Sequence, residues 1–573
     1  MNMDWMQEKP FYLKEDGIAW VKHIFSCMTD EQKIGQLFVL ECVSNDLSYI
    51  KPYLEKAEPG GVTLRADQTD SIKLFTQKLQ ECVKIPLLIS ANICHGIGDI
   101  ASDERNYLSN MGVGACQDAV YAYRQGVICG EGGNFLGISQ TFAPVADLNI
   151  NFMNSVIGTR SYGSNPKLVA DMVSAYIHGV QEKHVAATFK HFPGDGVDFR
   201  DQHVTPSVNS LTCEEWDASF GYVYKKAIDA GAMCCMVDHI TMPSYSMRLN
   251  PRLTYGECLP ATLSKELVTD LLRGKLGFNG LIMTDATHMA GMAGCLPRAE
   301  AVPLAIEAGC DMFLFYRDFD EDFRFMKEGL ERGRLSRQRL DEAVLRILAL
   351  KAALGLPWEK KQLPKEPSGL FDLWTREAMN KSITLVKNLR PGLFPITPER
   401  YPKILLYSHV SGHVQSPAGR PGGKKKDAAD KEQLFRYFCG RLEALGFLVE
   451  VCRKDFPLFN ALSAYHSREA VKAYDLVIHF ANGQNENGRS ERLFYEGHCS
   501  DDGPYTDMYV PTLLISMNSP YLLADAPRVK TAINCYTNTE EAVDALLDKL
   551  TGKSGFMGIS PVDPFCGLED TRW

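Results

Sequence analysis

A polar turn at residues 190–203, KHFPGDGVDFRDQH, carries side chains that could do chemistry. Two histidines and three aspartates surround one proline and two glycines. Such groups could transfer protons, bind a metal ion, or form an ordinary solvated loop. Asp201 and His203 lie two positions apart in a hydrophilic stretch, so burial in a core does not account for His203.

Polar residues also follow the other short apolar runs in the first part of the chain. They are Asn92 and His95, Asp147, Lys190 and His191, Asp238 and His239, and Asp285 and His288. If these runs are strands of a parallel barrel, the polar residues lie together at its carboxyl end, where barrel enzymes have their active sites. The alternative for Asp285 is that its side chain only caps the following helix.

The sequence contains little evidence for a metal site or for a serine nucleophile. The chain has no HExxH motif, no GxSxG motif and no Cys/His spacing typical of zinc. We therefore expect proton-transfer chemistry with no metal and no cofactor.

Eight apolar runs alternate with helix-like segments, which predicts the elements that position these residues. The runs are 35–40, 60–64, 85–92, 140–148, 185–192, 232–240, 280–286 and 310–316. Most are uniformly apolar or rich in β-branched and aromatic residues, as expected for strands buried on both faces. Segments 264–278 and 335–356 have helical periodicity. The pattern predicts a (β/α)₈ barrel, with a doubly wound open sheet as the alternative.

A polar, proline-containing stretch at 357–369 indicates a division of the chain. We expect a barrel at 1–356, a linker with a connecting helix at 357–380, and a smaller α/β sandwich at 381–573. Five further apolar runs support the sandwich: 403–410, 447–452, 474–481, 510–517 and 531–536. A polar loop at 483–504 could reach a substrate or be plain surface.

Composition narrows the range of possible binding partners and cellular locations. A net charge of −10 argues against nucleic acid as a partner. No run of 18 apolar residues and no secretory signal is evident, so we expect no membrane association. The 17 cysteines form no CxxC pair, and many lie in apolar runs. These features predict free thiols and a cytoplasmic location.

Several of these motifs together resemble one enzyme family. KHFPGDG, four residues, then Asp-Gln-His is similar to the signature of the β-N-acetylglucosaminidases of glycoside hydrolase family 3. Further segments resemble that family in the same order along most of the chain. They are 34–38, 142–151, 157–170, 260–286, 381–388 and 519–536. The resemblance implies a two-domain member with a barrel and an α/β sandwich.

The resemblance also implies roles for single residues. Asp285 matches the catalytic nucleophile, His203 the general acid/base and Asp201 its hydrogen-bonded partner. The residues that match sugar-binding positions are Arg160, Lys190, His191 and Asn92. Most members have an aspartate where Asn92 stands, so the sugar bound here could differ.

The implied reaction is retaining hydrolysis of a terminal β-linked N-acetylhexosamine, with a glycoconjugate or oligosaccharide as substrate. One alternative is a phosphorylase, because an imidazole would not repel a phosphate acceptor as a carboxylate would. The other is a sugar-binding protein that has lost catalysis. We expect Gln202, which replaces Ser or Thr, to change little, and the turn at 193–196 to let the loop swing onto substrate.

Overall fold

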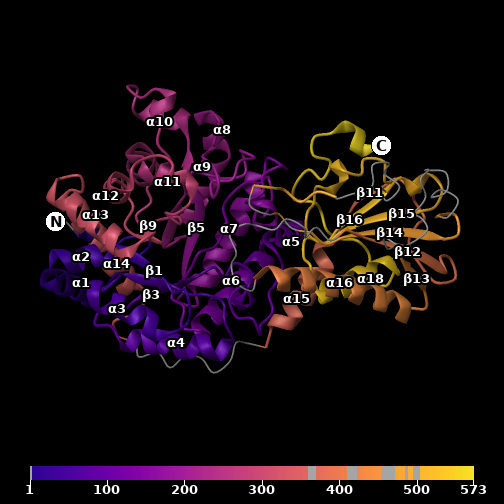
Figure 1. The fold of residues 1–573 in the computed structure, drawn as a ribbon, viewed down its shortest axis with the longest axis horizontal. Coiled ribbons are helices and arrows are strands. Elements are labelled where there is room, and N and C mark those ends of the chain that lie inside the picture. The colour runs from indigo at the N-terminus through magenta and orange to yellow at the C-terminus, as the bar shows by residue number, and fades with distance from the viewer. Residues whose placement is uncertain are drawn as a thin grey trace. The chain divides into compact units, whose positions relative to one another are not determined.

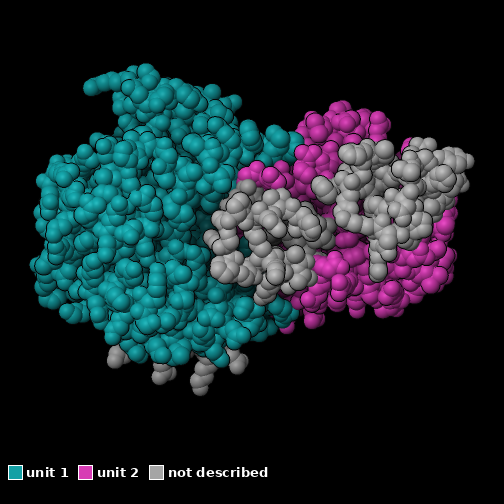
Figure 2. All heavy atoms as spheres, viewed as in Figure 1, with its two compact units in different colours: residues 1–107, 119–157, 164–371 teal, residues 108–118, 158–163, 372–573 magenta. Residues whose placement is uncertain are grey.

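The computed structural model describes residues 3–358, 369–409, 423–452, 471–483, 485, 488–493 and 504–573. Residues 359–368 of the predicted linker, and most of the polar loop at 483–504, lie outside these ranges. The chain divides into two compact units (Figure 2). The first comprises residues 1–107, 119–157 and 164–371, and the second comprises 108–118, 158–163 and 372–573. Two short segments of the range predicted as barrel therefore group with the second unit.

The first unit is built on a parallel sheet of eight strands (Figure 1). The strands are β1 (Phe38–Glu41), β2 (Gly61–Thr63), β3 (Leu88–Ala91), β4 (Gln140–Thr141), β5 (Ala186–Phe192), β7 (Cys234–Val237), β9 (Leu281–Thr284) and β10 (Phe313–Leu314). Their order is β10-β1-β2-β3-β4-β5-β7-β9, and a parallel bridge between Met283 and Met312 joins the two ends. The predicted barrel is confirmed, and the open-sheet alternative is wrong.

Burial explains why these short segments are strands. Every residue of β5 is buried, and the same holds for β2, β3, β7 and β9. Uniform burial follows from a parallel sheet that packs side chains inside the barrel and against helices outside it. Both predicted helices are present, 264–278 as η6 (Glu266–Lys275) and 335–356 as α14 (Arg337–Ala353).

Helices surround the barrel strands in the first unit. The longer ones are α1 (Glu15–Cys27), α2 (Asp30–Gln36), α3 (Leu47–Ala57), α4 (Thr69–Glu81), α6 (Ala119–Phe135), α7 (Pro166–Gln181), α9 (Phe220–Asp229), α12 (Arg298–Glu307) and α13 (Phe319–Glu331). The shorter elements are η1 (Asp4–Met6), η2 (Ile97–Asp99), β6 (Ser207–Val208), α8 (Cys213–Ala218), β8 (Ile240–Thr241), α10 (Pro243–Leu249), η4 (Tyr255–Glu257), η5 (Ala261–Leu263) and α11 (Ala290–Ala293). Helix α7 packs between α6 and α9.

The second unit contains a six-stranded sheet. Its strands are β11 (Thr384–Asn388), β12 (Lys403–His409), β13 (Leu448–Val451), β14 (Leu476–Ala481), β15 (Thr512–Ser516) and β16 (Thr531–Asn534), in the order β11-β16-β15-β14-β12-β13. The five predicted strands are present and parallel, and β11 adds an antiparallel edge. The other elements are η3 (Gly158–Arg160), α5 (Asn110–Ala115), α15 (Phe371–Ser382), α16 (Gly423–Ala444), η7 (Pro504–Met508), η8 (Leu522–Ala524), α18 (Glu540–Leu550) and η9 (Glu569–Arg572).

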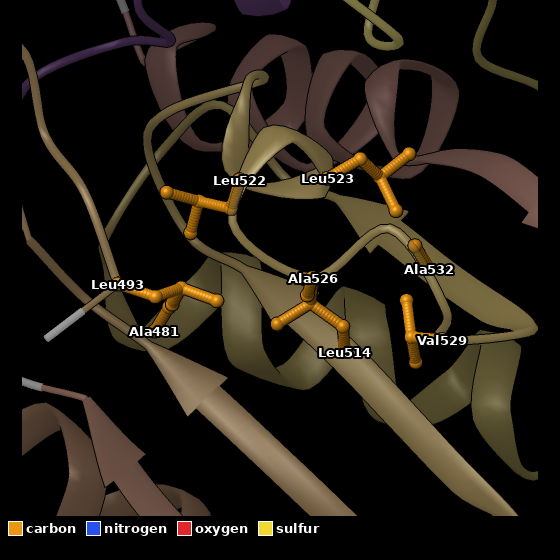
Figure 3. Packing of buried hydrophobic residues seen from close by; sticks show 8 residues of the cluster. All are labelled: Ala481, Leu493, Leu514, Leu522, Leu523, Ala526, Val529 and Ala532. Carbon is orange, nitrogen blue, oxygen red and sulfur yellow. The ribbon is translucent and has the colours of Figure 1, made fainter. Parts of the chain in front are cut away.

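The second unit has its own hydrophobic core (Figure 3). Leu514 of β15 packs there with Leu522 and Leu523 of η8, and all three are at most 2% exposed. The described cysteines are all free thiols. Within the described ranges, no helix is both long and apolar enough to cross a membrane.

Candidate active site

Asp285 lies directly after β9, at the carboxyl end of the barrel. Its backbone N–H donates to the carbonyl oxygen of Val237 at 2.8 Å, which holds it beside the end of β7. Its Oδ1 accepts from the N–H of Ala286 at 2.6 Å, and its side chain is 17% exposed. The next helix, α11, begins at Ala290 with Met289 as its N-cap. Asp285 therefore does not cap that helix, and its carboxylate is held at the opening of the barrel.

Charges around Asp285 keep it ionised. Burial by itself would raise the pKa of this carboxyl group. The charge interactions with His191 and His239, the hydrogen bond from Ala286 and the charge of Lys190 outweigh burial and hold the pKa of Asp285 below its ordinary value. Nε2 of His191 lies 4.0 Å from Oδ2 of Asp285. An ionised carboxylate at this position can act as a nucleophile.

The end of β5 places two predicted sugar-binding residues beside Asp285. Lys190 and His191 are both 3% exposed. Nζ of Lys190 donates to Oδ1 of Asn92 at 2.8 Å, and Nδ1 of His191 lies 2.6 Å from Oδ2 of Asp147. The N–H of His191 also donates to Asp147, at 3.1 Å. Asp147 thus fixes the ring that faces Asp285, a role that its place at a strand end could have suggested.

Asp201 and His203 form a hydrogen-bonded pair. Nδ1 of His203 lies 2.7 Å from Oδ1 of Asp201, which also accepts from the N–H of His203 at 2.8 Å. Asp201 is 1% exposed, whereas the side chain of His203 is 42% exposed. A buried carboxylate on one ring nitrogen orients the imidazole and stabilises its cation. With Nδ1 held by Asp201, Nε2 is the ring nitrogen that could exchange a proton with a bound molecule.

The turn between these two pairs is tightly packed. Gly194 and Gly196 have φ of +118° and +101°. A Cβ at Gly196 would lie 2.1 Å from the carbonyl oxygen of Leu148, and one at Gly194 would lie 2.4 Å from the ring of Phe220. Both positions therefore require glycine, and residues 193–196 are all buried. The expectation that the loop swings about this turn finds no support in the packing.

The remaining strand-end histidines differ in exposure: His239 is buried, His95 is half-buried, and His288 is exposed with its ring 5.9 Å from that of Phe315. His239 donates from Nε2 to the carbonyl oxygen of Ala286 at 3.0 Å, and burial lowers the pKa of His239 to about 4. His95 is held by Asp99, at 3.1 Å between Nδ1 and Oδ1. Across the part of the chain that the structure describes, no group of three His, Cys, Asp or Glu side chains is arranged to hold a metal ion.

Arg160 is the predicted site residue that the structure assigns to the second unit. It ends η3, and its carbonyl oxygen accepts from Nδ2 of Asn110 at 2.6 Å. The other predicted site residues all belong to the first unit. They are Asn92, Lys190, His191, Asp201, His203 and Asp285.

Comparisons with known proteins identify the family of the chain. Residues 29–350 match the model of the glycosyl hydrolase family 3 N-terminal domain. The chain is 40% identical to a β-N-acetylglucosaminidase/β-glucosidase of Cellulomonas fimi, across 98% of this chain and 99% of that protein. Among solved structures, β-glucoside phosphorylase BglX is 37% identical with a TM-score of 0.91, covering 99% of this chain and 100% of that one. A family 3 β-N-acetylglucosaminidase from Paenibacillus sp. str. FPU-7 is 25% identical with a TM-score of 0.75, covering 94% and 99%. The chain therefore belongs to glycosyl hydrolase family 3 and is a glycosidase.

Proposed function

We propose that this glycosidase removes a non-reducing terminal β-linked N-acetylglucosamine by a retaining mechanism. Asp285 attacks the anomeric carbon through a carboxylate oxygen, forming a glycosyl ester as the bond to the leaving oxygen breaks. His203 gives its Nε2 proton to that oxygen. Water then attacks the anomeric carbon, the ester bond breaks, and His203 takes the proton from the water.

One observation carries this proposal. An ionised carboxylate, Asp285, and an imidazole oriented by a carboxylate, His203, lie at the same end of the barrel. Asp285 is held ionised, as a nucleophile must be, and His203 is oriented by Asp201 at 2.7 Å. Backbone hydrogen bonds from Ala290 and Gly291 to the 202–203 segment connect the loop to the chain that follows Asp285. These two separate roles match a double-displacement mechanism, in which one group is the nucleophile and the other is the general acid/base.

The sugar pocket is expected to tolerate glucose as well as N-acetylglucosamine. Asn92 offers Lys190 a neutral acceptor, where an aspartate would make a stronger, charge-assisted bond. The Cellulomonas fimi relative carries both activities in its name. We therefore propose Asn92, Lys190 and His191 as sugar-binding residues, with the dual activity of the relative as the support for relaxed selectivity at the acetamido position. Arg160 stays a prediction from the sequence.

The test is release of chromophore from a panel of aryl β-glycosides. Turnover of the β-N-acetylglucosaminide or the β-glucoside is expected, and the Asp285→Ala variant should lose about 10⁴-fold or more in kcat. The His203→Ala variant should lose more on alkyl glycosides than on nitrophenyl glycosides, because a good leaving group needs less protonation. Absence of turnover across the panel would contradict the proposed activity.

A second candidate function is phosphorolysis, with phosphate in place of water. Two observations favour it: the acid/base group is an imidazole, which carries no negative charge, and β-glucoside phosphorylase BglX resembles this chain over nearly its whole length. Phosphate would attack the anomeric carbon of the glycosyl ester and release a sugar 1-phosphate. Strong acceleration of turnover by millimolar phosphate, with that product detected by ³¹P NMR, would identify a phosphorylase. A rate independent of phosphate would identify a hydrolase.

The alternative of a sugar-binding protein without catalysis has little to support it. The nucleophile position and both members of the proton-transfer pair are retained, and the family is one of glycosidases. Sugar binding without turnover of any aryl glycoside is the result that would favour it.

A further inference from the structure

Gln202 lies between the two residues of the proposed proton-transfer pair, and only 1% of it is exposed. Its Nε2 donates to Oδ2 of Asp195 at 2.9 Å and to Oδ2 of Asp238 at 2.6 Å. Asp195 belongs to the packed turn after β5, and Asp238 follows β7 directly. A single side-chain amide thus joins the loop that carries His203 to two separate parts of the barrel rim.

The backbone of the same segment is tied to the chain that follows the nucleophile. The carbonyl oxygen of Gln202 accepts from the N–H of Gly291 at 2.9 Å, and that of His203 accepts from the N–H of Ala290 at 3.3 Å. Both donors lie in α11, the first helix after Asp285. A Cβ at Gly291 would lie 2.9 Å from His239 and 3.2 Å from Gln202, so glycine permits this close approach.

We propose that Gln202 is a positioning residue that fixes the acid/base histidine by clamping its loop to Asp195 and Asp238. This inference rests on the proposed function, because it assigns Gln202 a part in the general-acid step of His203. The pair with Asp201 orients the imidazole within the loop. The clamp through Gln202 positions the loop itself, and with it the ring nitrogen that meets the leaving oxygen.

The two carboxyl groups explain why the clamp is an amide. In the described part of the chain, the partners of Asp195 are Nδ2 of Asn154, the N–H of Gly196 and Gln202. Those of Asp238 are the N–H of His239 and Gln202. Both carboxyl groups are therefore bound by uncharged donors. An amide nitrogen brings two hydrogens, one for each carboxyl group, whereas a hydroxyl brings one.

The protonation of these carboxyl groups also suits an uncharged partner. Burial and the neighbouring charge of Asp147 raise the pKa of Asp195 to about 7. Burial and the charge of Asp285 raise the pKa of Asp238 well above its ordinary value. A lysine or arginine here would bring a positive charge next to the nucleophile, whereas Gln202 binds the carboxyl oxygens without adding one.

The test compares leaving groups in the Gln202→Met variant, which keeps the side-chain length and removes both donor hydrogens. We measure kcat/KM on an alkyl and on a dinitrophenyl β-glycoside, since this ratio reports bond cleavage. The loss should be about 10- to 100-fold on the alkyl glycoside, which needs a well-placed acid, and less than about 3-fold on the dinitrophenyl glycoside. A variant that merely folds less well would lose the same factor on both substrates.

Controls separate the clamp from the proposed function. Gln338→Met makes the same change on the exposed face of α14, and it should leave both values unchanged. Gln202→Asn keeps an amide that can reach one carboxyl group, so its leaving-group dependence should be intermediate. If Gln202→Met does not fold, Gln202→Asn replaces it as the test of the clamp. Equal losses on both substrates, or no loss, would overturn the clamp. Absence of turnover by the unmodified enzyme would instead overturn the proposed function.

Discussion

At the residue scale, two aspartates at the ends of barrel strands, Asp285 and Asp238, have pKa values shifted in opposite directions. Asp285 is kept ionised by the positive charges of His191 and Lys190, whereas Asp238 has uncharged partners and a raised pKa. The two follow neighbouring strands, β9 and β7, so position along the barrel does not distinguish them. What distinguishes Asp285, the proposed nucleophile, from Asp238 is the charge of its partners.

Asn92 gives a prediction at this scale. The Asn92→Asp variant adds a negative charge beside Lys190 and weakens the positive potential that keeps Asp285 ionised. The pKa of Asp285 should rise, so the acid limb of the kcat/KM profile should move to higher pH by less than about one unit. Asn388→Asp, at an exposed position of the second unit, adds the same charge as a control. An unchanged acid limb would show that Lys190 does not act on the nucleophile.

At the element scale, the turn after β5 is a fixed base for the acid/base loop. The carbonyl oxygen of Pro193 accepts from Nε1 of Trp216 at 2.7 Å, and that of Gly194 accepts from Nδ2 of Asn209 at 3.0 Å. The N–H of Asp195 donates to Asp147 at 2.9 Å, and Asp147 in turn holds His191. The same short segment therefore supports both the sugar-binding end and the proton-transfer end of the motif.

A substitution at Gly196 tests whether the turn after β5 is as tightly packed as its contacts indicate. In the Gly196→Ala variant the new Cβ meets the carbonyl oxygen of Leu148, and the residue keeps a positive φ. The barrel should lose about 3 kcal/mol or more in free energy of unfolding, together with activity. The Gly333→Ala variant has a φ of +69° but no atom within 4 Å of its Cβ, so it should cost only about 1–2 kcal/mol. Equal costs, measured by denaturant unfolding, would show that the close approach at Gly196 relaxes.

The sequence predicts the barrel strands and the strand-end residues because both depend on local pattern. Each barrel strand is a short apolar run, and the end of a parallel strand places its next polar residue at the site. β11 was not predicted, since Thr384–Asn388 mixes buried and exposed positions and pairs antiparallel at the sheet edge. The connections of Gln202 could not be read from pattern, because its partners lie 7 and 36 residues away in the chain.

At the scale of the whole molecule, each unit has its own sheet and its own core. The barrel core includes Leu88 of β3, which is fully buried, and the second core includes Leu514 of β15, which is 2% exposed. A buried Asp311 also binds Arg273 of η6 and Arg339 of α14, and so connects these two helices to the barrel where β9 and β10 meet. Units with separate cores can unfold in separate transitions.

Matched leucine truncations test whether the two cores are independent. Leu514→Ala and Leu88→Ala remove the same atoms from the two cores, and each should cost about 2–5 kcal/mol because the site cannot collapse fully around the cavity. Because the larger unit has the larger entropy of unfolding, scanning calorimetry should show one transition lowered by about 3–7 °C in Leu88→Ala and by about 4–11 °C in Leu514→Ala. We expect Leu88→Ala to lower the transition at which glycosidase activity is lost, since the proposed catalytic residues Asp285, Asp201 and His203 belong to the barrel unit. Leu514→Ala should lower the other transition. If both transitions move together in either variant, the two cores form one cooperative structure, and mutations in the second unit would then affect catalysis through stability.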